Sequence, residues 1–139
     1  MPYSPMLIKP FKEELTDVGV KELLTADDVD KAMKEPGTTL VIVNSVCGCA
    51  AGMARPAVRK LMEDESVKKP DHIVSVFAGQ ELEATQRFRN HIPDIPPSSP
   101  SFAYFKDGEL VYFIPKHRIE SRDANSIAMD LQAVIEEFA

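Results

Sequence analysis

The sequence predicts an α/β fold with a mixed five-stranded sheet and an added N-terminal helix. Strand-like apolar runs alternate with helical patterns, which favours parallel βαβ units. A continuous run of apolar and β-branched residues at 38–46 is typical of a central strand covered on both faces. Asp107-Gly108 separates the last two strand-like runs and is a strong hairpin signal, so we expect an antiparallel pair there.

The first elements follow from local patterns. Residues 6–18 carry apolar side chains at steps of three to four, which predicts a helix that begins or kinks at Pro10. A short strand at 20–24 comes next. Thr25 is the expected N-cap of a second helix, because acidic residues follow it, and that helix should stop near Pro36.

The later elements complete the order α-β-α-β-α-β-α-β-β-α. Residues 50–63 have helical composition, and we expect a kink at Pro56. Strands are predicted at 73–77, 101–106 and 109–114, with a charged amphipathic helix at 81–92. A closing amphipathic helix is marked by Ile127, Leu131, Val134, Ile135 and Phe138.

Composition narrows the class of protein. We predict that residues 1–139 form one domain, with residues 1–19 as an N-terminal helical extension. A net charge of −6 without a basic cluster argues against nucleic acid as a partner. No stretch approaches the roughly 20 apolar residues of a membrane span, and the first residues do not resemble a signal peptide. We therefore expect a cytoplasmic protein with no membrane partner and leave its oligomeric state open.

The most informative feature is a pair of cysteines, Cys47 and Cys49, which are the only two in the chain. They stand between the central strand and a helix start, where first-turn amides and the helix dipole stabilise a thiolate. Gly48 between them gives the backbone the freedom to close a disulfide. Because the two Cα atoms of such a small ring barely reach disulfide geometry, we expect a strained, easily reduced bond.

The position of each cysteine predicts its role. Cys47 comes first and lies nearer the free amides, so we expect it to be the more exposed and nucleophilic sulfur. Cys49 would resolve the mixed disulfide that Cys47 forms. Asn44 and Ser45 precede the pair; they either set the turn and cap the helix or hydrogen-bond to the thiolate.

One basic segment lies on the same edge of the predicted sheet. The strand at 109–114 ends there, and His117 and Arg118 follow it. They either approach the thiolate and bind an anionic low-molecular-weight thiol or lie in an exposed loop.

Two other interpretations of the cysteines stay open. They could be inert buried residues, or they could bind zinc. A zinc site needs about four ligands, and the three histidines, His72, His91 and His117, are remote from the pair in sequence. We therefore expect no metal site and no cofactor.

From residue 19 onward the order of elements resembles the thioredoxin superfamily, with the early helix as an addition. Residues 99–109 resemble the last hairpin of that superfamily, whose first strand a cis-proline starts, with Pro100 in that position. The resemblance implies a three-layer sandwich and a cis Ser99–Pro100 bond facing Cys47, where the backbone of Ser99 can pair with a client. The motif departs from the superfamily, because it reads Cys-Gly-Cys, no Trp precedes it, and the strand at 41–43 offers no buried acid beneath the site.

A closer resemblance is to the bacilliredoxin family, also described as CXC disulfide isomerases. Segments 43–52, 76–80, 97–101 and 113–117 are similar to family signatures and span most of the chain. The resemblance implies a thiol-disulfide oxidoreductase that removes bacillithiol, or a similar thiol, from mixed disulfides on cytosolic proteins. The thiol would be a co-substrate, and the cysteines the catalytic residues. Protein disulfide isomerisation and a non-catalytic adaptor or metal-binding role are the alternatives.

Overall fold

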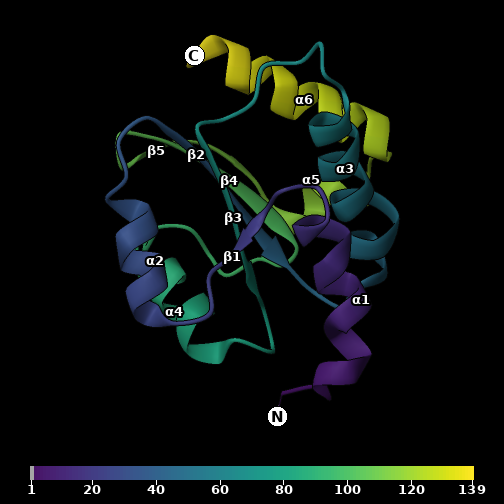
Figure 1. Ribbon diagram of the computed structural model, residues 1–139, viewed down its shortest axis with the longest axis vertical. Helices are drawn as coiled ribbons and strands as arrows, with labels where there is room; N and C mark the ends of the chain where they lie inside the picture. Colours follow the sequence, from purple (N-terminus) through teal and green to yellow (C-terminus); the bar gives the residue numbers. More distant parts are fainter. Residues whose placement is uncertain (1) are drawn as a thin grey trace.

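The computed structural model describes residues 2–139, and a five-stranded sheet lies at its centre. The strand order is β1-β3-β2-β4-β5 (Figure 1). β2 is parallel to β3 and antiparallel to β4, and it occupies the middle of the sheet. The mixed sheet predicted from the sequence is confirmed. The strand bounds are β1 Lys21–Glu22, β2 Thr38–Asn44, β3 His72–Phe77, β4 Ser101–Lys106 and β5 Glu109–Ile114.

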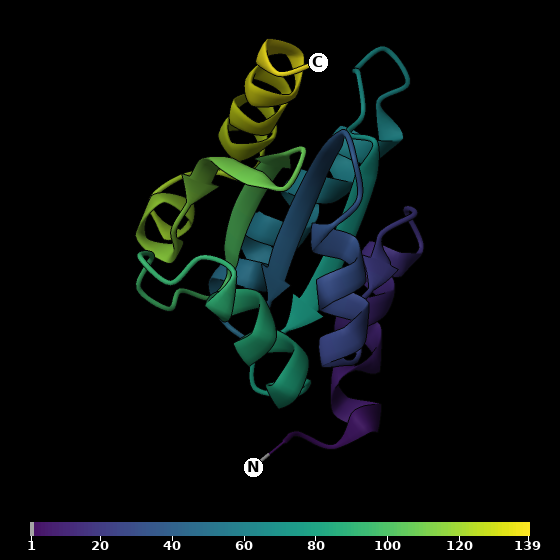
Figure 2. The same cartoon turned by 90° about the vertical axis from the view of Figure 1, so that its left-hand side faces the viewer.

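Helices cover both faces of the sheet. One layer holds α1 (Pro5–Thr16), α3 (Arg55–Glu63), α5 (Lys116–Glu120) and α6 (Ala124–Glu137), and the other holds α2 (Ala26–Met33) and α4 (Leu82–Asn90). Figure 2 shows α2 and α4 in front of the sheet. Leu40 and Ile42 of β2 pack into the first layer and Val41 and Val43 into the second, which explains the apolar run.

Two local predictions are confirmed in detail. Thr25 caps α2 and exchanges hydrogen bonds with Asp28 in a capping box. Asp107 and Gly108 both have positive φ, 49° and 85°, as the two central residues of a type I′ hairpin turn require. β1 is shorter than the predicted strand, and the sequence analysis missed α5.

The helix after the cysteines is irregular just before Pro56, the residue at which the sequence predicts a kink. A π-helical turn, Ala50–Ala54, precedes α3. Pro56 follows this turn directly, in the first turn of α3, and the kink predicted there stays a prediction. Such π turns are frequent near functional sites. No helix within residues 2–139 is long and apolar enough to cross a membrane.

Candidate active site

Cys47 and Cys49 form a disulfide at the carboxyl end of β2. Their Cα atoms lie 5.3 Å apart, inside the range usual for disulfides. The ease with which this bond is reduced stays a prediction.

The helix begins directly after Cys47. The carbonyl oxygen of Cys47 accepts hydrogen bonds from the amides of Ala50 and Ala51, at 2.9 and 3.2 Å. The amide of Cys49 donates to Cys47 Sγ at 3.4 Å. Cys47 is half-buried, whereas Cys49 is only 8% exposed. The Cys47 sulfur is therefore the more accessible one and faces a first-turn amide, an arrangement that stabilises a thiolate.

Residues 44–47, which we call the cysteine turn, are held by their own polar groups. Asn44 Oδ1 accepts the amide of Ser45 at 2.9 Å, and Ser45 Oγ accepts the amide of Cys47 at 3.2 Å. Asn44 and Ser45 are both buried. Of the roles considered for them, the structure supports setting the turn, since the hydrogen bond to the Cys47 sulfur comes from Cys49.

Beneath the cysteine turn lies Arg55, which the sequence analysis missed. Its side chain is 1% exposed. Nη1 donates to Asn44 Oδ1 at 2.9 Å and to the Ser45 carbonyl at 2.8 Å, while Nε bonds to the carboxylate of Glu14. The only local signal was its helical spacing, because Arg55 shares a face with the core residue Val58.

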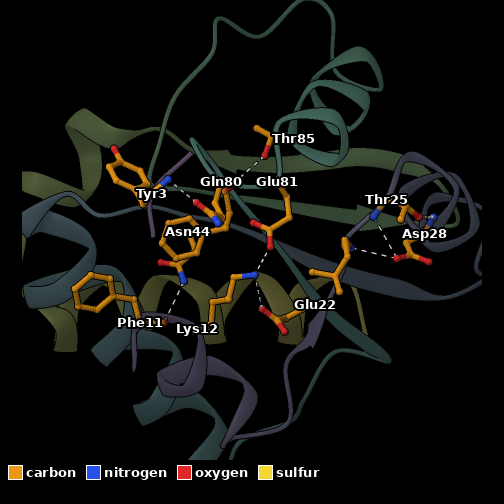
Figure 3. A network of polar contacts seen from close by, with 12 residues as sticks. Tyr3, Phe11, Lys12, Glu22, Thr25, Asp28, Asn44, Gln80, Glu81 and Thr85 are labelled. Atoms are coloured by element: carbon orange, nitrogen blue, oxygen red, sulfur yellow. Dashed lines mark hydrogen bonds and ion pairs between the residues drawn. The ribbon is translucent and has the colours of Figure 1, made fainter. Parts of the chain in front are cut away.

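The N-terminal helix is tied to the site by further polar contacts (Figure 3). Asn44 Nδ2 donates to the carbonyl of Phe11 at 3.2 Å. Lys12 lies between Glu22, at 3.3 Å, and Glu81. Burial lowers the pKa of Lys12, but the hydrogen bond and charge of Glu81, together with Glu22, raise it above its ordinary value. α1 is therefore a fixed part of the structure around the cysteine turn.

A cleft of about 390 Å³ opens beside Cys47. Tyr3, Ser99, Arg89 and Lys116 line it together with the cysteine turn. The Ser99–Pro100 bond is cis, as predicted. β2 and β4 pair Val43 with Ser101, so one step further along both strands Pro100 comes opposite Asn44.

Among the described residues that line this cleft, Arg89 and Lys116 carry positive charge and none carries a carboxylate. Within residues 2–139 neither side chain forms an ion pair. Burial lowers the pKa of Arg89, the direction expected for a partly desolvated cation. The sequence analysis missed both residues, because they come from two separate elements, α4 and α5.

The basic segment considered from the sequence lies elsewhere. His117 is exposed on α5 and does not line the cleft. The Arg118 guanidinium lies 5.7 Å from the ring centroid of Tyr112 and pairs with Asp130 of α6. The structure therefore does not bring these two side chains together with Cys47. In the part of the chain that the structure describes, no three His, Cys, Asp or Glu side chains could hold a metal ion.

Solved structures share this architecture. The oxidised mitochondrial thioredoxin 3 of Saccharomyces cerevisiae superposes with a TM-score of 0.59 at 17% identity, covering 89% of this chain and 98% of that one. A thioredoxin from Fasciola hepatica gives a TM-score of 0.58 at 20% identity, covering 86% and 100%. Similarity at this level of identity shows a thioredoxin-like fold.

Sequence relatives add the chemistry. A family model described as disulphide isomerase matches residues 3–139. A bacilliredoxin of Salinibacter ruber is 50% identical over 140 residues, covering 99% of this chain and 82% of that protein. One from Cytophaga hutchinsonii is 48% identical over 136 residues, covering 98% and 99%. A thioredoxin-like fold with a Cys-X-Cys pair after its central strand thus defines a thiol-disulfide oxidoreductase. The chain belongs to the bacilliredoxin family.

Proposed function

We propose that this protein removes bacillithiol, or a similar anionic low-molecular-weight thiol, from mixed disulfides on cytosolic proteins. One observation carries the proposal. The accessible sulfur of Cys47 opens on a cleft that contains two cations without carboxylate partners, in a chain whose net charge is −6. A cationic cleft favours an anionic leaving or transferred thiol.

Cys47 begins the reaction. Its thiolate attacks the S–S bond between a client protein and the low-molecular-weight thiol. A new S–S bond forms between Cys47 and the small thiol, while the client cysteine leaves as a thiolate and takes a proton from water. Arg89 and Lys116 would hold the anionic groups of the small thiol during this transfer.

Cys49 completes the reaction. Its thiolate attacks Cys47, so that the Cys47–Cys49 disulfide forms and the small thiol is released. Two electrons pass from the cysteine pair to the mixed disulfide, and an external thiol reductant restores the pair. Cys49 is only 8% exposed, which suits an attack on the neighbouring Cys47 better than a reaction with a client protein.

The remaining site residues would shape the approach of the client. The backbone of Ser99, before the cis bond to Pro100, would pair with an extended client segment. Gly48 would let the backbone close the disulfide ring, and Asn44 and Ser45 would hold the turn. We also propose that one domain carries this whole site, since its lining residues run from Tyr3 to Lys116.

The test uses a client protein modified with bacillithiol. Cys47→Ser should abolish removal of the thiol, because Cys47 is the only thiol among the described residues that line the cleft. Cys49→Ser should make the first attack and retain the small thiol on Cys47, which mass spectrometry of the intact protein detects. Unchanged turnover by Cys47→Ser would refute the mechanism, and preferential labelling of Cys49 by brief iodoacetamide treatment would reverse the two roles.

Protein disulfide isomerisation is a second candidate, because the family model that matches residues 3–139 is described as a disulphide isomerase. Isomerisation needs one attacking thiol and no net electron transfer. A Cys49→Ser variant that refolds a scrambled disulfide protein at the wild-type rate would favour this candidate. Loss of this refolding activity in both Cys47→Ser and Cys49→Ser would favour bacillithiol removal.

A further inference from the structure

Arg55 is a buried charge that the exchange mechanism does not use. A guanidinium that is 1% exposed is strongly unfavourable unless it is paired and hydrogen-bonded. Arg55 meets both conditions through two groups of the cysteine turn and the carboxylate of Glu14. Its Cζ also lies 4.7 Å from the ring centroid of Phe11 in α1. Its guanidinium thus joins the N-terminal helix to the cysteine turn.

A continuous series of hydrogen bonds leads from Arg55 to the nucleophile. Arg55 donates to Asn44 Oδ1 and to the Ser45 carbonyl. Asn44 Oδ1 also accepts the Ser45 amide, and Ser45 Oγ accepts the amide of Cys47. Moving the guanidinium would therefore release the turn that places the Cys47 sulfur against the helix start.

The charges around the turn reinforce this arrangement. Glu14 faces Arg55 from α1, Arg59 of α3 donates to the Glu14 carbonyl, and Arg89 and Lys116 line the same cleft as Cys47. The Glu14 side chain is 40% exposed, so water screens its negative charge, whereas Arg55 is shielded from water. The net electrostatic effect on the turn is positive and favours a thiolate.

We propose that Arg55 is a positioning residue for thiol-disulfide exchange, which holds the cysteine turn from beneath and keeps the Cys47 sulfur at the first helical amide as a thiolate. Glu14 balances the buried charge, so α1 is part of the active-site apparatus. The inference rests on the proposed role of Cys47 as the nucleophile.

The experiment measures the rate of Cys47 alkylation against pH in a Cys49→Ser background, where Cys47 is the single thiol. Arg55→Gln should raise the midpoint pH by about one unit, and alkylation at pH 6 should slow about tenfold. Glu14→Gln should move the midpoint the other way, by roughly 0.3 units, because it removes a screened negative charge beside Arg55. Arg55→Lys, which keeps the charge, should restore most of the wild-type midpoint.

The matched control is Arg59→Gln. Arg59 lies one helical turn beyond Arg55 and contacts the same helix α1 through the Glu14 carbonyl. Within residues 2–139 its hydrogen bond and its ion pair go to Glu14 and Glu63, and none goes to the cysteine turn. This variant loses a cation and a tie to α1, and its midpoint should stay at the wild-type value. A shift equal to that of Arg55→Gln would overturn the proposal.

The shifts in the midpoint pH of Cys47 alkylation are expected to have opposite signs in Arg55→Gln and Glu14→Gln, which separates a positioning role from a general loosening of the structure. Arg55→Gln and Glu14→Gln both break the link between α3 and α1, so a purely structural role predicts shifts of the same sign. Equal-sign shifts, or an unchanged midpoint in both, would overturn the proposal. If Arg55→Gln does not fold, as judged by circular dichroism, Arg55→Lys and Glu14→Gln give the same decision. No bacillithiol is used, so this result stands apart from the test of the proposed substrate.

Discussion

The polar groups at the two ends of β2 are paired in opposite ways. At the amino end, Thr38 donates its amide to Asp71 at 2.9 Å and accepts the Asp71 amide at 3.0 Å. Gly37 and Asp107 make a similar exchange at 2.7 and 2.8 Å. In each of these two exchanges, both hydrogen bonds join the same two residues. This end closes loops and stabilises the fold.

At the carboxyl end, partners are drawn from distant elements and some charges stay unmatched. Asn44 has its partners in α1 and α3, and the described lining of the cleft beside Cys47 holds two cations and no carboxylate. The difference indicates that the end of β2 with reciprocal hydrogen-bonded pairs stabilises the fold. The end with unpaired cations beside a sulfur carries out the thiol exchange. Changes at the two ends should therefore affect different observables.

The largest expected effect follows from reversing the charge of the cleft. Arg89→Glu combined with Lys116→Glu should slow the reaction with a bacillithiol mixed disulfide about 10- to 100-fold, because the anion is then repelled. The reaction with a cysteamine mixed disulfide, which carries a positive charge, should become faster. Stopped-flow kinetics at low salt measures both rates.

The control for charge alone is Lys31→Glu combined with Lys34→Glu. Both lysines are exposed: Lys31 lies in the last turn of α2, and Lys34 is its C-cap. The Met33 carbonyl beside them lies near the hairpin turn at Gly108. This variant changes net charge by the same amount far from the cleft. If it slows the bacillithiol reaction equally, the cleft is not the site of the effect.

A smaller effect is expected at the other end, and on stability alone. Gly108 has φ of 85°, and a Cβ there would come 3.3 Å from the Met33 carbonyl oxygen. Gly108→Ala should lower the free energy of unfolding by about 1 kcal/mol, measured by urea denaturation, and leave the alkylation rate of Cys47 unchanged. Gly52→Ala is the control, because a Cβ at position 52 meets no atom within 4 Å. An altered Cys47 reactivity in Gly108→Ala would weaken the separation of the two ends.

The smallest expected effect is on the pH dependence of stability, through the carboxylate of Asp71. The Thr38 amide is the main cause that lowers the Asp71 pKa below its ordinary value of 3.8. The carboxylate therefore stabilises the fold above pH 3.8, and this contribution is lost as the pH falls through the lower folded pKa. Asp71→Asn should unfold at slightly less urea at pH 7, and the difference should shrink below pH 3.8. A difference that grows in acid would contradict this assignment.

Much of the fold could be predicted because its signals are local. The burial of β2 on both faces, the capping box at Thr25 and the Asp107-Gly108 turn each depend on residues close together in sequence. The cysteine pair was equally visible. The sequence also placed the end of β5 at the edge of the sheet that bears Cys47.

The rest of the site depends on contacts that no local pattern encodes. Arg55 and Glu14 are 41 residues apart, and their pairing arises only when α1 packs against α3. Topology indicates which edge a segment reaches but not where each side chain points. Lys116 therefore lines the cleft, while its neighbour His117 does not. The burial of Arg55 likewise depends on tertiary packing, because nothing in the local sequence distinguishes Arg55 from Arg59.

The π-helical turn at Ala50–Ala54 sets where the chain length can change. It contains extra backbone between the disulfide and the face of α3 that carries Arg55 and Val58. A π turn that loses one residue closes into an α turn, so a single deletion there keeps the register of α3. A single deletion within α3 would instead rotate everything beyond it by about 100° about the helix axis, and Leu61 would leave the core. Insertions and deletions among homologues should therefore avoid α3 and gather in exposed loops, such as residues 64–66.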